Sequence, residues 1–179
     1  TSEANAVITL DLGHGNTLTT TANSQGKWSF APNPIADGET ATLTATDTAG
    51  NVGAETITDK ADTVAPLAPS VDLNNAITLS GTSEANAVIT LDLGHGNTLT
   101  TTVDSQGKWS FAPNPIADGE TATLTATDAA GNIGAETTTA KADTVAPLAP
   151  SVEQNNAASL SGTSEANAVI TLDLGHGNT

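Results

Sequence analysis

The sequence has no cysteine, methionine, tyrosine or arginine, and it is poor in aromatic and basic residues. Without cysteine it can form neither a disulfide nor a thiolate metal site, and with 2% aromatic residues any hydrophobic core must be thin. Four basic residues face 20 acidic ones, for a formal net charge of -16. This charge repels phosphate groups and argues against nucleic acid as a partner, whereas divalent cations are compatible with it.

Long apolar runs are also missing. No segment approaches the roughly 20 apolar residues that span a bilayer, so we expect no membrane insertion in this part of the chain. No stretch resembles a signal peptide, and Thr1 and Thr179 each fall inside a repeat, so we expect any targeting signal or anchor to lie outside these 179 residues.

The sequence does contain a repeat of 81 residues. Residues 1–81 and 82–162 align without a gap and differ only at positions 22, 23, 48, 52, 57, 59, 72, 73, 77 and 78. Such near identity indicates a tandem array. We expect a partial module at 1–61 that lacks its first strands, a complete module at 62–142, and the N-terminal part of a third at 143–179.

Within the complete module, short segments alternate between apolar and polar residues with a period of two, which is typical of half-buried strands. The expected strands are near 67–73 and at 76–81, 87–93, 98–103, 108–112, 120–127 and 135–141. Their inward residues would be Ile77, Leu79, Ile89, Leu91, Leu93, Trp109, Phe111, Ala122, Leu124 and Ala126. The pattern predicts an all-β protein of antiparallel Ig-like sandwich modules, each of about seven strands.

The strand order also predicts which loops lie at the same end of the sandwich. The loops at 83–86, 104–107 and 128–132 are expected at the end where the linker arrives. The loops near 74, 94–97 and 113–119 are expected at the opposite end.

Three stretches resemble the bacterial Ig-like repeats of large biofilm-associated and adhesive surface proteins: DTVAPLAPSV, LSGTSEANAVITL and GKWSFAPNPIADGETATLTATDAAGN. The resemblance covers the whole module. It implies an extracellular protein, secreted or held at the bacterial surface, that acts as a stalk and has calcium at the junctions between modules. The absence of cysteine is compatible with that location.

The loop arrangement suggests where calcium would bind, because calcium takes about six to eight oxygen ligands. At one junction the expected ligands are Asp62, Glu84 and Asp128, with Asp104 and Asn132 as second choices. The repeat supplies further candidates: Asp143 and Glu165 at the next junction, Glu3 and Asp47 as a half-site, and Asp37 and Asp118 from the opposite end. The alternative interpretation is that these are ordinary turn carboxylates.

Other kinds of site have less support. His14, His95 and His176 recur once per repeat without a second histidine nearby, which favours a solvated turn residue over a zinc ligand. Trp28 and Trp109 are expected in the core rather than on a sugar-stacking surface. No catalytic constellation or phosphate-binding loop is present, so we expect no enzyme activity.

These observations favour a structural spacer in a bacterial adhesin, stiffened by calcium and in contact with neighbouring identical modules. An alternative is a module that binds weakly to glycan or to identical repeats on other cells, with avidity from repetition. A third option is self-association into filaments, in which residues 143–179 of one chain donate the first strands that the module at 1–61 lacks.

Overall fold

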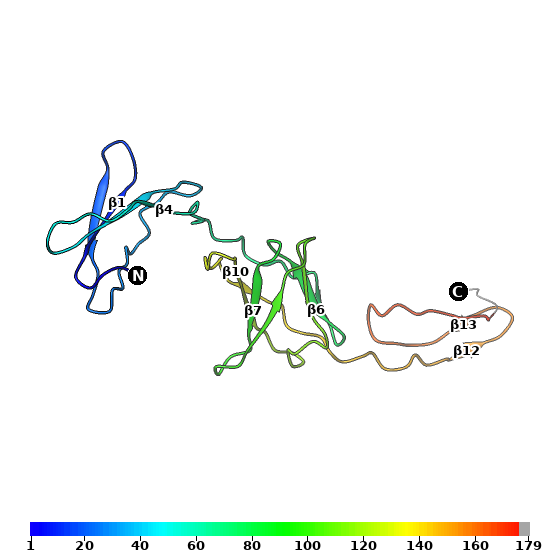
Figure 1. The fold of residues 1–179 in the computed structure, drawn as a ribbon. Helices are drawn as coiled ribbons and strands as arrows, with labels where there is room; N and C mark the ends of the chain where they lie inside the picture. Colours follow the sequence, from blue (N-terminus) through cyan, green and yellow to red (C-terminus); the bar gives the residue numbers. More distant parts are fainter. Residues whose placement is uncertain (176–179) are drawn as a thin grey trace. The chain divides into compact units, whose positions relative to one another are not determined.

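The computed structural model describes residues 1–175, which contain strands and turns but no helix (Figure 1). They divide into two compact units, one of Thr1–Leu67 with Thr127–Ala135 and one of Ala68–Ala126 with the chain from Glu136 onward. The predicted all-β Ig-like class is confirmed. The module boundaries at 61 and 142 remain a prediction.

The complete sandwich has seven strands in two sheets. The strands are β5 (Leu73–Asn74), β6 (Leu79–Thr82), β7 (Val88–Asp92), β8 (Thr98–Thr102), β9 (Lys108–Phe111), β10 (Thr123–Thr127) and β11 (Thr137–Thr138). One sheet has the order β5-β6-β9 and the other β11-β10-β7-β8. The first strand is shorter than predicted, although Ser70 N–H and Asp72 N–H continue its pairing by donating to the carbonyls of Thr82 and Ser80 at 2.9 and 2.8 Å.

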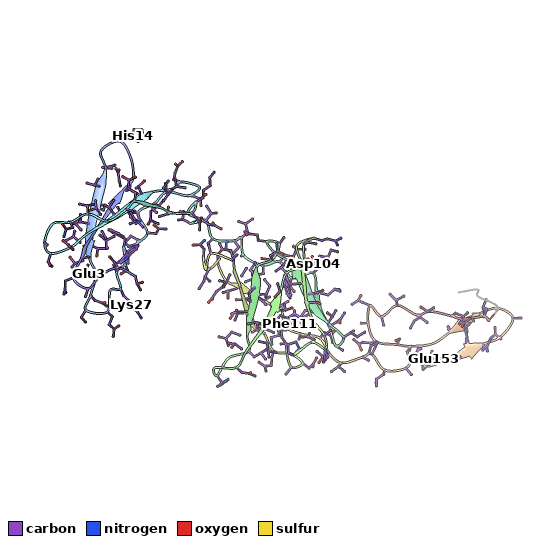
Figure 2. The ribbon with its side chains drawn as sticks, viewed as in Figure 1. Glu3, His14, Lys27, Asp104, Phe111 and Glu153 are labelled. Atoms are coloured by element: carbon purple, nitrogen blue, oxygen red, sulfur yellow. The ribbon has the colours of Figure 1, made fainter. Side chains whose placement is uncertain are left out.

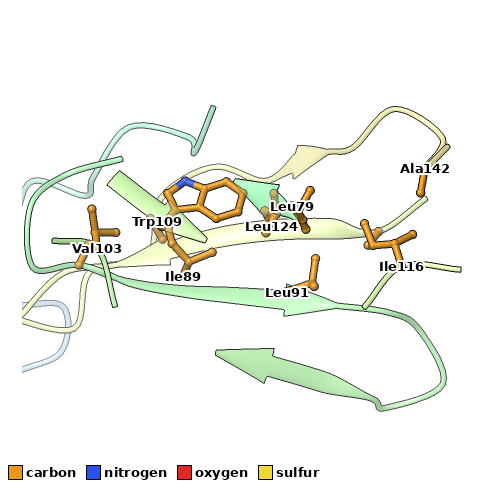
Figure 3. Close-up of a cluster of buried hydrophobic side chains, with 11 residues drawn as sticks. Leu79, Ile89, Leu91, Val103, Trp109, Ile116, Leu124 and Ala142 are labelled. Carbon is orange, nitrogen blue, oxygen red and sulfur yellow. The ribbon is translucent and has the colours of Figure 1, made fainter. Parts of the chain in front are cut away.

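The core lies between these two sheets (Figure 3). Inward residues alternate with outward ones along β7 and β10, as a half-buried strand requires. The fully or nearly buried side chains are Leu79, Ala87, Ile89, Leu91, Val103, Trp109, Ile116, Ala122, Leu124, Ala126 and Ala142. Ile77 was expected among them and is 77% exposed, because it belongs to the turn between β5 and β6, where its N–H donates to the Asn75 side chain.

Gly81 is required by the packing of Trp109. A Cβ atom on Gly81 would collide with the carbonyl oxygen of Ser70 and lie 2.8 Å from Cζ2 of Trp109. The indole therefore packs directly against the β6 backbone, and Phe111 meets it edge-on at a centroid distance of 6.1 Å. This contact lets one tryptophan fill the space between the sheets in a module with few aromatic residues.

The first unit contains a single sheet of order β2-β1-β3-β4. Its strands are β1 (Val7–Asp11), β2 (Thr17–Thr21), β3 (Thr42–Thr46) and β4 (Thr56–Ile57). Residues 27–30 have the same sequence as β9 but form no strand. In the complete sandwich β9 pairs with β6, whereas residues 27–30 pair with no strand among residues 1–175. Trp28 is consequently only half-buried.

The third segment repeats the first two strands as β12 (Gln154–Asn155) and β13 (Leu160–Ser161). The Val-Ile-Thr-Leu run that follows shows the effect of context on burial. Its isoleucine is 2% exposed at Ile8, 0% at Ile89 and 56% at Ile170, although the local sequence is the same. Ile170 lacks the strand pairing that buries the other two.

Each of the two predicted loop groupings is confirmed for two of its three loops, and the placement of the loops at 128–132 and 94–97 stays a prediction. Ser83 N–H donates to the Gly107 carbonyl at 2.9 Å, so the loops at 83–86 and 104–107 lie together. Asn114 Nδ2 donates to Asn74 Oδ1 at 2.8 Å, which joins the loop at 113–119 to the turn near 74.

Candidate metal centre at the linker

The hairpin after β10 is built around the side chain of Asp128. Asn132 N–H donates to Asp128 Oδ1 at 2.8 Å, and Asn132 Nδ2 donates to Asp128 Oδ2 at 2.8 Å. Asp128 is 8% exposed. Asp47 and Asn51 make the same pair of bonds in the other copy, at 2.8 and 2.7 Å. The Asp-x-x-Gly-Asn spacing therefore specifies a turn that is closed by a carboxylate and an amide.

These hydrogen bonds change the acidity of both carboxyl groups. The pKa of Asp128 lies below its ordinary value of 3.8, chiefly because the Asn132 side chain donates to the ionised form; burial acts in the opposite direction. The pKa of Asp47 is lowered in the same way, with the Asn51 side chain as the largest cause. Both groups are therefore ionised at neutral pH.

The linker peptide between Asp62 and Thr63 is held from both sides within the first unit. Its N–H donates to Asp37 Oδ1 at 2.8 Å, and its carbonyl accepts from Asn132 Nδ2 at 3.1 Å. Since Asp128 fixes Asn132, the side chains of Asp37, Asn132 and Asp128 act on one peptide group. We call this arrangement the linker clasp. The carboxylate of Asp62 itself is exposed, and within residues 1–175 its one hydrogen bond is a long one, 3.4 Å, from Val64 N–H.

Part of the clasp recurs in the second unit. Thr144 N–H donates to Asp118 Oδ1 at 2.8 Å, and its hydroxyl lies 3.2 Å from the same oxygen. Asp143 precedes this residue and is exposed. Asp37 and Asp118 each hold the linker segment that follows their own copy, and their role as calcium ligands that reach the junction from the preceding module stays a prediction.

Asp104 has a different structural role. Its Oδ1 accepts from Gln106 N–H at 2.8 Å and from Lys108 N–H at 2.9 Å. Asn23 occupies the same position in the other copy and accepts the equivalent bonds at 2.9 and 3.0 Å. Because an uncharged amide closes the turn equally well, the turn explains Asp104 without a metal ion.

The three glutamates of the Thr-Ser-Glu-Ala-Asn loops have exposed side chains. The backbone carbonyls of Glu3, Glu84 and Glu165 each accept from the N–H three residues later, at 3.2 Å. Over residues 1–175 their carboxylates make no hydrogen bond, which leaves them free to bind a cation.

The predicted ligands are thus distributed over both units. Glu3, Asp37, Asp47, Asp62, Asp128 and Asn132 belong to the first unit, and Glu84, Asp104, Asp118, Asp143 and Glu165 belong to the second. Among residues 1–175, no three carboxylate or imidazole groups lie close enough together to hold a metal ion by themselves. The ligand assignments remain predictions. The linker clasp was not predicted as a hydrogen-bonded unit; the recurring Asp-x-x-Gly-Asn spacing signals the Asp128–Asn132 turn but not its contact with the linker.

His14, His95 and Trp109 fit the structural interpretation, whereas Trp28, also expected in the core, is only half-buried. His14 lies at the tip of the β1–β2 hairpin (Figure 2), and it is exposed with a φ of 55°. His95 has the same exposure and a φ of 55°, between Gly94 and Gly96, which also have positive φ. Trp109 is 3% exposed and so offers no face for stacking on a sugar. His176 lies outside the described residues.

No helix in the described part of the chain is long and apolar enough to cross a membrane. Comparison with solved structures finds similar chains among bacterial adhesins. One comes from a 1.5-MDa bacterial ice-binding adhesin (23% identity, 82% of this chain and 55% of that one, TM-score 0.35). Another is a Ca2+-stabilized adhesin that helps an Antarctic bacterium bind ice (31% identity, 83% and 42%, TM-score 0.35). A third is a tetra-tandem repeat from the extending region of a large adhesion protein (24% identity, 86% and 46%, TM-score 0.35).

The chain spans about half the length of each of these structures. None of the curated proteins that were searched matches the sequence. Residues 1–63 match the bacterial Ig-like domain, and residues 65–143 match the bacterial Ig domain. The two matches together include most of the sequence, and the chain belongs to the bacterial Ig-like domains.

Proposed function

We propose that this chain is a structural spacer in an extracellular bacterial adhesin, with a mechanical rather than a catalytic role. The observation that carries the proposal is the linker clasp, which holds the peptide between Asp62 and Thr63 within the first unit. A linker whose peptide is hydrogen-bonded on both sides is ordered, and order in the linker is what a stiff spacer requires.

The prolines of the linker act in the same direction. Pro66 and Pro69 are both buried. Each fixes its own φ and biases the preceding residue towards an extended conformation, which reduces the number of conformations open to the linker. The linker is therefore restrained by backbone stiffness and by hydrogen bonds together.

Calcium is the second part of the proposal. The available donors are carboxylate, amide and carbonyl oxygens, the hard ligands that calcium prefers. Asp62 and Asp143 have exposed carboxylates beside segments that Asp37 and Asp118 hold. A calcium ion bound there would complete its coordination with backbone carbonyls and water. It would neutralise part of a net charge of -16 and restrain the linker further.

The expected energetic effect is modest. Extracellular calcium modules have dissociation constants of about 0.1 to 1 mM. A tenfold excess of calcium over that constant would stabilise the folded state by about 1.4 kcal/mol per site. This is a measurable part of the roughly 5 to 15 kcal/mol that stabilises an ordinary domain.

Small-angle scattering and thermal unfolding of the whole chain test the calcium part. We expect calcium, compared with chelator or with magnesium at equal ionic strength, to raise the melting temperature and narrow the distribution of interatomic distances. The double variant Asp62→Asn, Asp143→Asn should lose this response. Asp92→Asn is the matched control, since Asp92 accepts from Gly94 N–H at 2.7 Å in a hairpin turn and an amide oxygen can replace it. An unchanged melting temperature and shape with and without calcium would refute calcium binding.

The spacer role has its own test. Beads coated with the chain should remain dispersed at all calcium concentrations, since a spacer has no ligand of its own.

The competing candidate is cohesion between identical repeats. It is favoured by β8, an uncharged strand at the edge of its sheet whose residues Thr98, Thr100 and Thr102 are exposed. The test variant is Thr100→Lys combined with Thr19→Lys, the equivalent change on β2. If the beads cluster and this variant abolishes the clustering, cohesion is established and the passive spacer is rejected.

A further inference from the structure

The first and last strands of the complete sandwich belong to different sheets but are tied directly to each other. The Thr137 hydroxyl donates to the Pro69 carbonyl at 2.6 Å. Further along, Asn74 Nδ2 donates to the Ala140 carbonyl at 2.9 Å. Asn75 and Asp143 then form a parallel β-bridge. These three links join the three-stranded sheet to the four-stranded sheet at the edge where the chain enters and leaves the sandwich.

Both sides of these links are fixed to the rest of the sandwich. On the incoming side, Asn114 Nδ2 donates to Asn74 Oδ1 at 2.8 Å and to the Asn75 carbonyl at 2.9 Å. On the outgoing side, Ala142 N–H donates to the Glu120 carbonyl at 2.9 Å, and the Ala142 carbonyl accepts from Gly119 N–H at 2.8 Å. The side chain of Ala142 is buried. Neither strand can therefore move away without breaking bonds deeper in the module.

The direction of the two strands decides how they respond to tension. The partner numbers rise together, from 69 with 137 to 74 with 140 and 75 with 143, so the strands run parallel. Tension applied through the chain acts on the incoming strand at Pro69 and pulls it towards the N-terminus. It acts on the outgoing strand at Asp143 and pulls it towards the C-terminus. The two pulls are opposite and run along the strands, so the links are sheared together. An antiparallel pair pulled from adjacent ends would instead open one bond at a time.

We propose that the links at Thr137, Asn74 and Asn75 form a mechanical clamp that sets the force at which the module unfolds. The proposal rests on the spacer function, because a spacer that joins a cell to a surface carries tension. The two can fail separately. The clamp is tested by force on the isolated chain, whereas the spacer role is tested by bead clustering.

Single-molecule force spectroscopy of the whole chain, held at its two ends, provides the experiment. The complete sandwich is identified by the length it releases, at most about 3.3 to 3.6 Å for each residue that unfolds. We expect Thr137→Val, which removes only the hydroxyl bond, to unfold roughly 2- to 10-fold faster at a given force, as expected for the loss of one hydrogen bond.

The matched control is Thr78→Val. The Thr78 hydroxyl also donates to a backbone carbonyl, that of Phe111 at 3.3 Å, but this bond joins neighbouring strands of one sheet and lies outside the clamp. We expect the control to lose equilibrium stability in urea to a similar extent while its unfolding rate under force stays within 2-fold of wild type. Asn74→Ala provides a second clamp variant if Thr137→Val does not fold. Equal acceleration of clamp and control variants, or no acceleration of either clamp variant, would overturn the proposal.

Discussion

At the scale of single residues, short polar side chains take the place of backbone carbonyls as hydrogen-bond acceptors in the loops. Asp92, Asp104 and Asn114 each accept from an N–H two residues later, which closes a turn without a helix or a strand. Asp128 accepts from the N–H of Asn132, four residues later, and also orients the Asn132 amide that holds the linker. A chain rich in Asp, Asn and Gly can thus build ordered loops around a small core.

The lowered pKa of Asp128 predicts an acid-sensitive contribution to stability. Its folded-state pKa is below the ordinary 3.8, so the contribution is fully present above that value and is lost as the pH falls through the folded pKa. We expect Asp128→Asn to be less stable than wild type at neutral pH, and the difference to shrink between about pH 4 and pH 2.

Urea unfolding at a series of pH values measures this difference. Asp143→Asn serves as the control for the loss of one negative charge, because the Asp143 side chain makes no hydrogen bond within residues 1–175. If the stability difference between wild type and Asp128→Asn is the same at pH 5 and at about pH 2.5, the ionised carboxylate contributes nothing.

At the scale of elements, identical sequences have different structures because they have different partners. Residues 108–111 form β9 against β6, whereas the same residues at 27–30 form no strand. A strand is stabilised by hydrogen bonds to its neighbour and by burial of one face, and neither is available to Lys27–Phe30. Alternation of apolar and polar residues is therefore not sufficient to form this strand.

This comparison predicts what a strand equivalent to β6 would do to residues 27–30. We expect a copy of residues 62–81, placed ahead of Thr1, to pair with Lys27–Phe30 and bury Trp28 as Trp109 is buried. With Trp109→Phe in the background, the fluorescence of Trp28 should shift to shorter wavelength and become less accessible to iodide. The same added segment with the counterpart of Gly81 replaced by valine is the control, since a Cβ atom at that position collides with the Ser70 carbonyl. Unchanged emission with the unmodified segment would show that strand pairing is not what limits the burial of Trp28.

At the scale of the whole molecule, the dominant feature is a net charge of -16 on 179 residues. Like charges in a compact chain repel one another, and this repulsion is screened by salt. We expect the melting temperature to rise when sodium chloride is increased from about 0.01 to 0.15 M, over which the Debye length falls from about 30 to 8 Å. Calcium chloride at equal ionic strength should raise it further. A melting temperature independent of sodium chloride would mean that self-repulsion is not a significant cost in this fold.

Much of the fold could be predicted from the sequence. The alternation of Ile89 with Leu91 and of Leu124 with Ala126 located the inward faces of β7 and β10, because a strand places alternate side chains on opposite faces. Ile77 was placed wrongly, because alternation continues into a turn that leaves its side chain in solvent. For the candidate site, residue type and repeat position indicated that Asp62, Asp128 and Asn132 act near the linker. They did not indicate that the contact runs through the Asp62 carbonyl.

The sequence by itself determined the repeat, the all-β class, the acidity and the turn chemistry, because these depend on local composition and on the identity of each residue. Only the tertiary structure decided which copy of a segment becomes a strand, which isoleucine is buried, and which polar groups meet across the chain. The linker clasp and the links between the first and last strands join residues 26 to 70 positions apart. Contacts over such separations arise when distant parts of the chain are brought together by the fold, and no local pattern specifies them.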